Sequence, residues 1–171
     1  MIWKRIHFVF SGLLTVVFIL YLCCLAYVLF LGRVLPSVFH WVLIGTIIPH
    51  ALVSICLFLF SKNGISFAGY WRYSLGTVLQ RLSACCIALL LHDHMELWLS
   101  QNPQTSLIPG EILFLGAVCL HISLSLPKFF LSIGFCPNKW AYQLTQYVSY
   151  FLAGGLFLVS FFALLLWGKG R

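Results

Sequence analysis

The residues of this sequence best suited to chemistry are histidines inside long hydrophobic segments. These are His40, His50, His92, His94 and His121, and His7 lies close to the start of the first segment. Ionisable side chains are costly in hydrocarbon, so each is a candidate functional residue. Such an imidazole can ligate a haem iron, carry protons, bind another metal, or simply hydrogen-bond a neighbouring helix. The spacing alone leaves these alternatives open.

Depth along the segments separates the histidines into two groups. At about 1.5 Å per residue, His50 and His121 fall near the middle of their segments. The other three of the five lie toward one end, at similar depth. Two imidazoles from different helices can hold a haem iron between them. If the chain binds haem, His50 and His121 are therefore the expected ligands.

Arg81 is a second unusual residue, because it stands inside the third hydrophobic segment. Its guanidinium can extend along the helix to the membrane surface. Alternatively, it can pair with an anion such as a haem propionate, to which a guanidinium bonds in a bidentate fashion. The sequence favours neither interpretation.

The elements that position these residues are five hydrophobic segments, predicted as transmembrane helices. The chain has 171 residues, 62% of them hydrophobic and 8% charged, against about 45–50% and about 25% in soluble domains. Segments of this length satisfy their backbone hydrogen bonds in hydrocarbon only as helices. We predict one all-α domain over residues 1–171, a five-helix polytopic membrane bundle with spans at 8–31, 38–60, 73–99, 111–133 and 143–167.

The basic residues predict an orientation in the membrane. With Met1 inside, seven Lys and Arg residues fall on the inner side and three on the other, which places the N-terminus inside and the C-terminus outside. The net charge of +7 is spread over the loops without a basic run, so nucleic acid is not an expected partner. The seven cysteines form no C-x-x-C pair and are interpreted as small free hydrophobic residues.

Three motifs, in order and spacing, resemble a known family. The stretch from Tyr73 to His94, YSLGTVLQRLSACCIALLLHDH, places His94 thirteen residues after Arg81. Upstream stands Pro49-His50-Ala51, and downstream His121 precedes Gly134-Phe135 and a polar turn. With an opening Arg5-Ile6-His7, this order resembles the single-chain, five-helix, two-haem cytochrome b subunit of succinate dehydrogenase and fumarate reductase.

The resemblance implies a function for the whole chain. It implies a haem b-binding anchor in a bacterial inner membrane, transferring electrons between quinone and peripheral flavoprotein and iron–sulfur subunits. Such a chain is a subunit of an enzyme complex and not an enzyme by itself. By the same resemblance, His50 and His121 ligate the iron, Arg81 contacts haem, and His94 would ligate the iron of a second haem. The alternatives are a different b-type membrane cytochrome and a haem-free transporter or structural membrane protein.

The sequence departs from the family pattern in its first helix. Where the family carries a histidine ligand to the second haem, this chain reads Tyr21-Leu22-Cys23-Cys24. His40 and Cys23 are candidate replacements, although a thiolate in hydrocarbon without a nearby cation is unfavourable. We expect one haem, because a lost ligand most simply means a lost site.

Overall fold

The computed structural model describes residues 2–31, 33, 35–60, 75–99 and 107–169. These residues form the helices α1 (Ile2–Phe30), α2 (Ser37–Phe60), α4 (Leu75–Leu99), α5 (Ile108–Ser132) and α6 (Lys139–Lys169). All five helices are long and apolar enough to cross a membrane. The predicted all-α class and number of hydrophobic helices are thus confirmed for the described part of the chain.

Several helices extend beyond the predicted spans. α1 begins at Ile2 rather than residue 8, α5 at Ile108 rather than 111, and α6 covers Lys139–Lys169 rather than 143–167. The hydrophobic pattern marks only the part of a helix suited to hydrocarbon, whereas Lys, Arg and Trp readily continue a helix into the membrane interface. The predicted start of the third span, Tyr73, lies outside the described residues.

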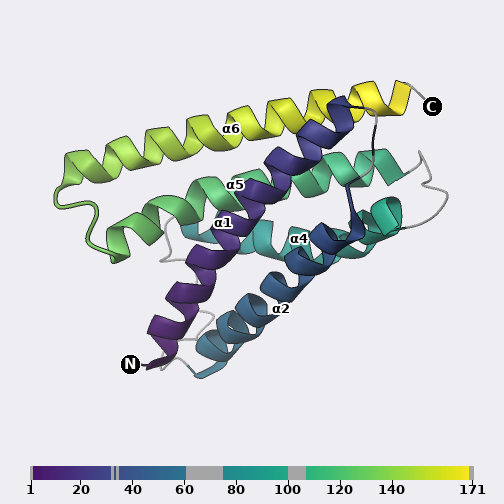
Figure 1. The fold of residues 1–171 in the computed structure, drawn as a ribbon. Coiled ribbons are helices and arrows are strands. Elements are labelled where there is room, and N and C mark those ends of the chain that lie inside the picture. Colours follow the sequence, from purple (N-terminus) through teal and green to yellow (C-terminus); the bar gives the residue numbers. More distant parts are fainter. Residues whose placement is uncertain (1, 32, 34, 61–74, 100–106, 170–171) are drawn as a thin grey trace.

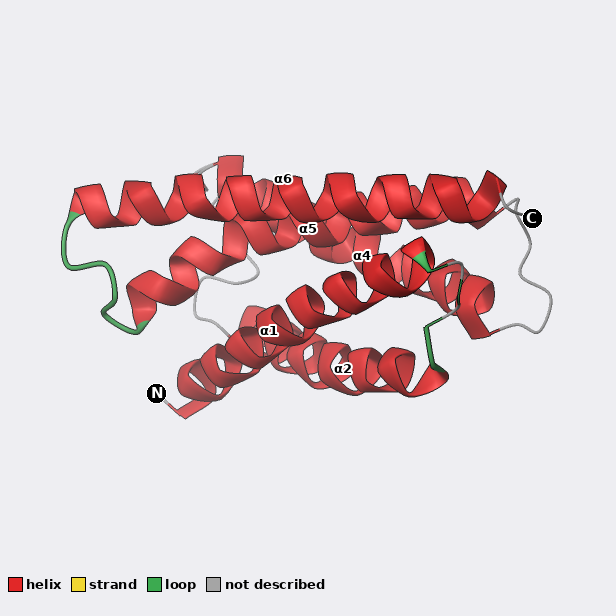
Figure 2. Cartoon of the chain, turned by 45° about the horizontal axis from the view of Figure 1, so that its top comes forward, coloured by secondary structure: helices red, strands yellow, loops and turns green. Residues whose placement is uncertain are grey.

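The helices alternate in direction, so the bundle has two ends (Figure 1). We call N end the one where α1, α4 and α6 begin and α2 and α5 finish, and C end the opposite one. α5 packs against both α4 and α6, while α1 lies alongside α2 (Figure 2) and also contacts α6. By contrast, α2 and α4 contact each other only sparsely.

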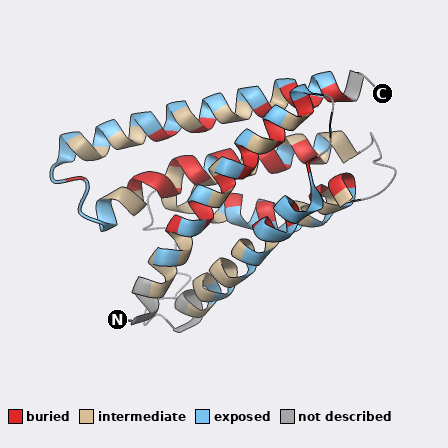
Figure 3. Ribbon diagram, viewed as in Figure 1, coloured by how far each residue is buried: buried red, intermediate tan, exposed pale blue. Residues whose placement is uncertain are grey.

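The buried core lies mainly along α1 and α5, with contributions from the facing side of α6 (Figure 3). Phe18, Leu22, Leu25, Phe114 and Leu115 are almost completely covered. Large apolar side chains also point outward on every helix; Phe151 of α6 is 86% exposed. An exterior this apolar suits contact with lipid rather than with water.

Gly12 permits the close approach of α1 to the end of α5. It is buried, and a Cβ atom added there would collide with the ring of Phe129. That ring stacks on Phe8 with their centroids 4.9 Å apart, which restricts how far it can move. A glycine at this crossing therefore allows two helices to touch.

Replacing Gly12 by valine should destabilise the protein by about 1–3 kcal/mol, the usual cost of overpacking a filled core. The matched control is Gly154→Val in α6, where an added Cβ meets no atom within 4 Å. The free energy of unfolding, measured by denaturant titration in detergent micelles, compares the two variants. Equal losses in both would contradict the assigned packing.

Candidate functional site

A buried polar cluster lies near the C end of the bundle; we call it the C-end cluster and define it as Tyr21, His40, His94, Trp98 and Glu111. His94 of α4 is its centre. The Nδ1 atom of His94 lies 2.7 Å from Oε2 of Glu111, and its Nε2 lies 2.8 Å from the Tyr21 hydroxyl. The side chains of His94 and Glu111 are both fully buried. Both ring nitrogens of His94 are thus engaged within the protein.

One assignment of protons satisfies these three groups together. The Tyr21 hydroxyl donates to Nε2 of His94, and the Nδ1–H of His94 donates to the Glu111 carboxylate. The hydrogen bonds connect α1, α4 and α5. Because these groups are cut off from water, each depends on its neighbours for hydrogen bonding.

Aromatic rings enclose the centre of this cluster. The Phe114 ring stacks on His94 at a centroid distance of 4.2 Å, and the ring of His40 lies 5.7 Å from His94. His40, from α2, is fully buried. Among the described residues, neither ring nitrogen of His40 has a hydrogen-bond partner, and the same holds for Nε1 of Trp98 and Oε1 of Glu111. The rings of Tyr21, His94 and Trp98 pack around His40, which also lies near the backbone of Pro36.

The sequence predicts His94 and His40 at this level but not the roles of Tyr21 and Glu111. Tyr21 stands where the resembled family has its first-helix ligand, and it contacts His94 directly. Glu111 stands at the start of the predicted span 111–133, yet it is only 1% exposed. A usable signal existed: an acid in the first turn of an apolar helix, at the depth of a histidine, indicates a buried pair.

A second group of histidines lies nearer the N end; we call it the N-end histidines and define it as His7, His50 and His121. The rings of His7 and His50 lie 5.0 Å apart, and Nε2 of His7 is 3.0 Å from the Ser54 hydroxyl. His50 of α2 and His121 of α5 lie close enough for their charges to interact. The predicted ligands are therefore brought to the same region of the bundle, and His7, predicted only at the start of a helix, joins them.

The surroundings of His121 fix the orientation of its ring. Nδ1 lies 3.1 Å from the carbonyl oxygen of Gln80 and 3.2 Å from the Ser83 hydroxyl, both on α4. A carbonyl only accepts, so the neutral imidazole carries its proton on Nδ1 and keeps a lone pair on Nε2. Histidines that ligate metals are commonly held in this way. On α2, Nδ1 of His50 is buried and has no partner among the described residues.

Arg81 lies one turn or less from these contacts, on α4. The residue is half-buried, and one terminal nitrogen of its guanidinium is shielded from solvent. It lies within electrostatic range of Lys128 on α5. The guanidinium is thus turned at least partly into the protein, as the anion-pairing interpretation requires and full extension to the surface does not.

Neither the C-end cluster nor the N-end histidines resemble an ordinary metal site. Within the described residues, no three His, Cys, Asp or Glu side chains are arranged to hold a metal ion. A haem iron needs only two axial ligands from the protein, the porphyrin supplying the other four. His50 and His121 satisfy the donor type and the two-helix requirement, and His121 also has the supporting hydrogen bonds. The residues present fit haem at the N-end level.

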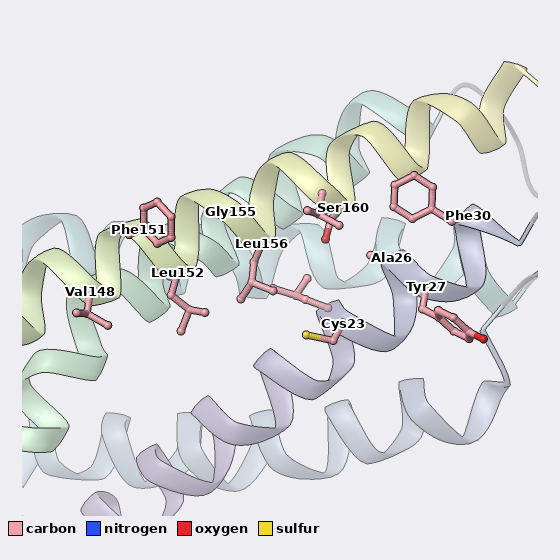
Figure 4. A pocket seen from close by; sticks show the side chains of 12 residues that line it. Cys23, Ala26, Tyr27, Phe30, Val148, Phe151, Leu152, Gly155, Leu156 and Ser160 are labelled. Carbon is pink, nitrogen blue, oxygen red and sulfur yellow. The ribbon is translucent and has the colours of Figure 1, made fainter.

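A groove with a volume of about 600 Å³ lies elsewhere, between α1 and α6. Figure 4 shows Leu152, Leu156 and Ser160 of α6 facing Cys23 and Ala26 of α1. No histidine lines it. Cys23, considered as a replacement ligand, lines this groove, two residues and about 200° around the helix from Tyr21. The groove offers a surface for hydrocarbon.

Comparisons with known proteins give no relative: no family model, no curated protein and no solved structure matches this chain.

Tyr21→Phe should lower the free energy of unfolding by about 1 kcal/mol or slightly more, because it leaves Nε2 of buried His94 without its donor. The control is Tyr27→Phe on the same helix, whose side chain is 67% exposed and should change stability by less than about 0.5 kcal/mol. Denaturant titration of both variants in the same detergent gives the comparison. A loss no larger for Tyr21→Phe would argue against the hydrogen bond.

Proposed function

We propose that this chain is a haem b-binding membrane anchor of succinate dehydrogenase or fumarate reductase type, embedded in a bacterial inner membrane. It would transfer electrons between quinone and peripheral flavoprotein and iron–sulfur subunits. The observation that carries the proposal is that His50 of α2 and His121 of α5 lie within electrostatic range of each other in a bundle of apolar helices. The proposed partner subunits come from the resemblance of the motif order to the cytochrome b subunit family.

The chain would ligate the haem iron, orient the haem and bury it. Nε2 of His121 is the available donor, because the Gln80 carbonyl holds the proton on Nδ1. His50 is the opposite ligand, on a helix that contacts α4 only sparsely. Arg81 is placed to pair with a haem carboxylate. When bound, haem supplies the one-electron chemistry, which the residues around it tune.

The proposed docking side is the N end, which the basic residues predict to be inside. Lys139 begins α6 there, while Lys62 and Arg72, the other two cations expected to face the peripheral subunits, lie outside the described residues. The N-terminus would then be inside and the C-terminus outside, in agreement with the distribution of Lys and Arg.

One haem per chain is the favoured stoichiometry. A second haem ligated by His94 requires its Nε2, which the Tyr21 hydroxyl occupies at 2.8 Å. The ring is also flanked by Phe114 and His40. Ligation by His94 stays a prediction, and these contacts count against it.

A haem-free membrane protein is the second candidate, and one observation favours it. His121 and His94 both hydrogen-bond groups on neighbouring helices, as structural histidines in membrane bundles do. A reduced-minus-oxidised absorption spectrum of the purified chain separates the two functions. A b-type band supports the anchor, and a spectrum without haem bands supports the alternative. Copurification of a dehydrogenase separates the anchor from other b-type cytochromes.

His50→Ala and His121→Ala should each abolish the b-type band or shift it strongly, since each removes an axial ligand. His92→Ala is the control, because the His92 side chain is 85% exposed and should keep the wild-type spectrum. Circular dichroism confirms that the variants stay helical. Full haem content in His121→Ala would refute the ligand assignment.

The haem content should be one per chain, measured by a pyridine haemochrome assay against the protein concentration. His94→Phe should retain that haem and its spectrum even if the bundle is less stable, because His94 is assigned to the C-end cluster. Two haems per chain in the wild type, with one lost in His94→Phe, would show that the second site is intact.

A further inference from the structure

The outward side of α4 carries two ionisable side chains where lipid is expected. The His92 side chain is 85% exposed and that of Glu96 is 45% exposed. Nε2 of His92 lies 4.0 Å from Oε2 of Glu96, which is longer than a hydrogen bond. His92 stands about 10 Å before the end of α4 at Leu99. Because an imidazole facing hydrocarbon at that depth is costly, we expect this side of α4 to be covered.

His92 and Glu96 continue a row of side chains that follows α4 at intervals of four residues. We call it the α4 outer row; all its members are exposed, and they are Ala84, Ala88, His92 and Glu96. Residues four apart lie on the same side of a helix. Alanines in such a row let two helix backbones approach closely, and polar side chains can hydrogen-bond across the contact. The row therefore combines the two features of a contact between transmembrane helices.

The other described helices leave the α4 outer row open. α5 packs on the opposite side of α4, where Ser83 contacts His121 and His94 contacts Glu111. α2 contacts α4 only sparsely. Asp93, the acid beside His92 in sequence, lies against the start of α5 rather than in the row. The row is thus available to another molecule.

We propose that the α4 outer row is the contact surface between two copies of this chain. Copies inserted in the same orientation bring their rows together around a two-fold axis. The ring N–H of His92 in each copy then donates to the Glu96 carboxylate of the other copy. Each copy supplies one donor and one acceptor at matching depth, so the surface is self-complementary. Lipid chains offer neither group, and an unrelated helix would need both at this depth.

Cys85 gives a direct test, because it is exposed and flanks the row. It lies about 60° from Ala88 around the helix, whereas Cys86, which is also exposed, lies about 160° away. Membranes containing the full chain are oxidised with copper phenanthroline and separated on a non-reducing gel. The wild type and Cys86→Ser should form a cross-linked dimer, and Cys85→Ser should not.

Sedimentation equilibrium in density-matched micelles measures the dissociation constant of the dimer. His92→Phe and Glu96→Leu should each raise it about sevenfold, because each removes two symmetry-related hydrogen bonds. Tyr147→Phe is the control, since this side chain is 70% exposed on α6 and should leave the constant unchanged.

A second pair of variants tests the close approach of the two backbones. Ala88→Leu should raise the dissociation constant about tenfold, because the larger side chain separates the helices. Cys86→Leu adds bulk on another side of the same helix and should have no effect. All these side chains face outward, so each variant should keep the helix content of the wild type in circular dichroism.

The dimer does not depend on the proposed electron-transfer function, because the row faces away from His121; the haem spectrum reports on that function separately. A wild-type chain that sediments as a monomer and gives no cross-link would overturn the proposal. A cross-link that survives Cys85→Ser, or equal losses of affinity in the control variants, would place the contact elsewhere. Cross-linking of Cys85 to a different membrane protein instead of a second copy would also contradict it.

Discussion

The need to satisfy polar groups inside an apolar bundle controls this structure. Burial of the Glu111 carboxylate or the His94 imidazole without hydrogen-bond partners would cost several kcal/mol. The Tyr21–His94–Glu111 chain meets that need at 2.8 and 2.7 Å. It also fixes the relative depth of α1, α4 and α5, because a shift along any helix axis would break a hydrogen bond that water cannot replace. Apolar packing gives no comparable restriction, since lipid is as apolar as leucine.

The C-end cluster and the N-end histidines differ in how their polar atoms are hydrogen-bonded. At the C-end cluster, both ring nitrogens of His94 are engaged and aromatic rings surround it. At the N-end level, His121 uses only Nδ1 in the contacts that hold it, and buried Nδ1 of His50 has no partner among the described residues. Buried polar atoms without a partner among the described residues also occur in the C-end cluster, namely both ring nitrogens of His40, Nε1 of Trp98 and Oε1 of Glu111. The proposed assignment of ligation to the N-end histidines therefore rests on His121, whose Nδ1–H donates to the Gln80 carbonyl and whose Nε2 keeps a lone pair.

The hydrophobic pattern predicted the five helices but not their ends, because Lys139 and Trp140 continue α6 beyond the segment suited to hydrocarbon. The two histidine levels were also predictable, since depth follows from the rise per residue. The contacts between helices were not predictable from the sequence. Ten residues separate His40 from His50, or about 80° around the helix, and they join different groups. Which group each joins depends on how α2 is rotated against α1 and α4, and a single sequence does not encode this visibly.

Tyr21 connects the departure from the family pattern with the geometry of the C-end cluster. A phenol reaches His94 directly, whereas two imidazoles ligating one iron must stand on opposite sides of a porphyrin. With hydroxyl and Nε2 2.8 Å apart, α1 and α4 are held by a single hydrogen bond across the space that such a cofactor would need. In the proposed anchor, Tyr21 would thus stand in the stretch of the missing ligand and also hydrogen-bond α1 to α4. Under the proposed function, one haem per chain and the closed, hydrogen-bonded C end would then follow from the same residue.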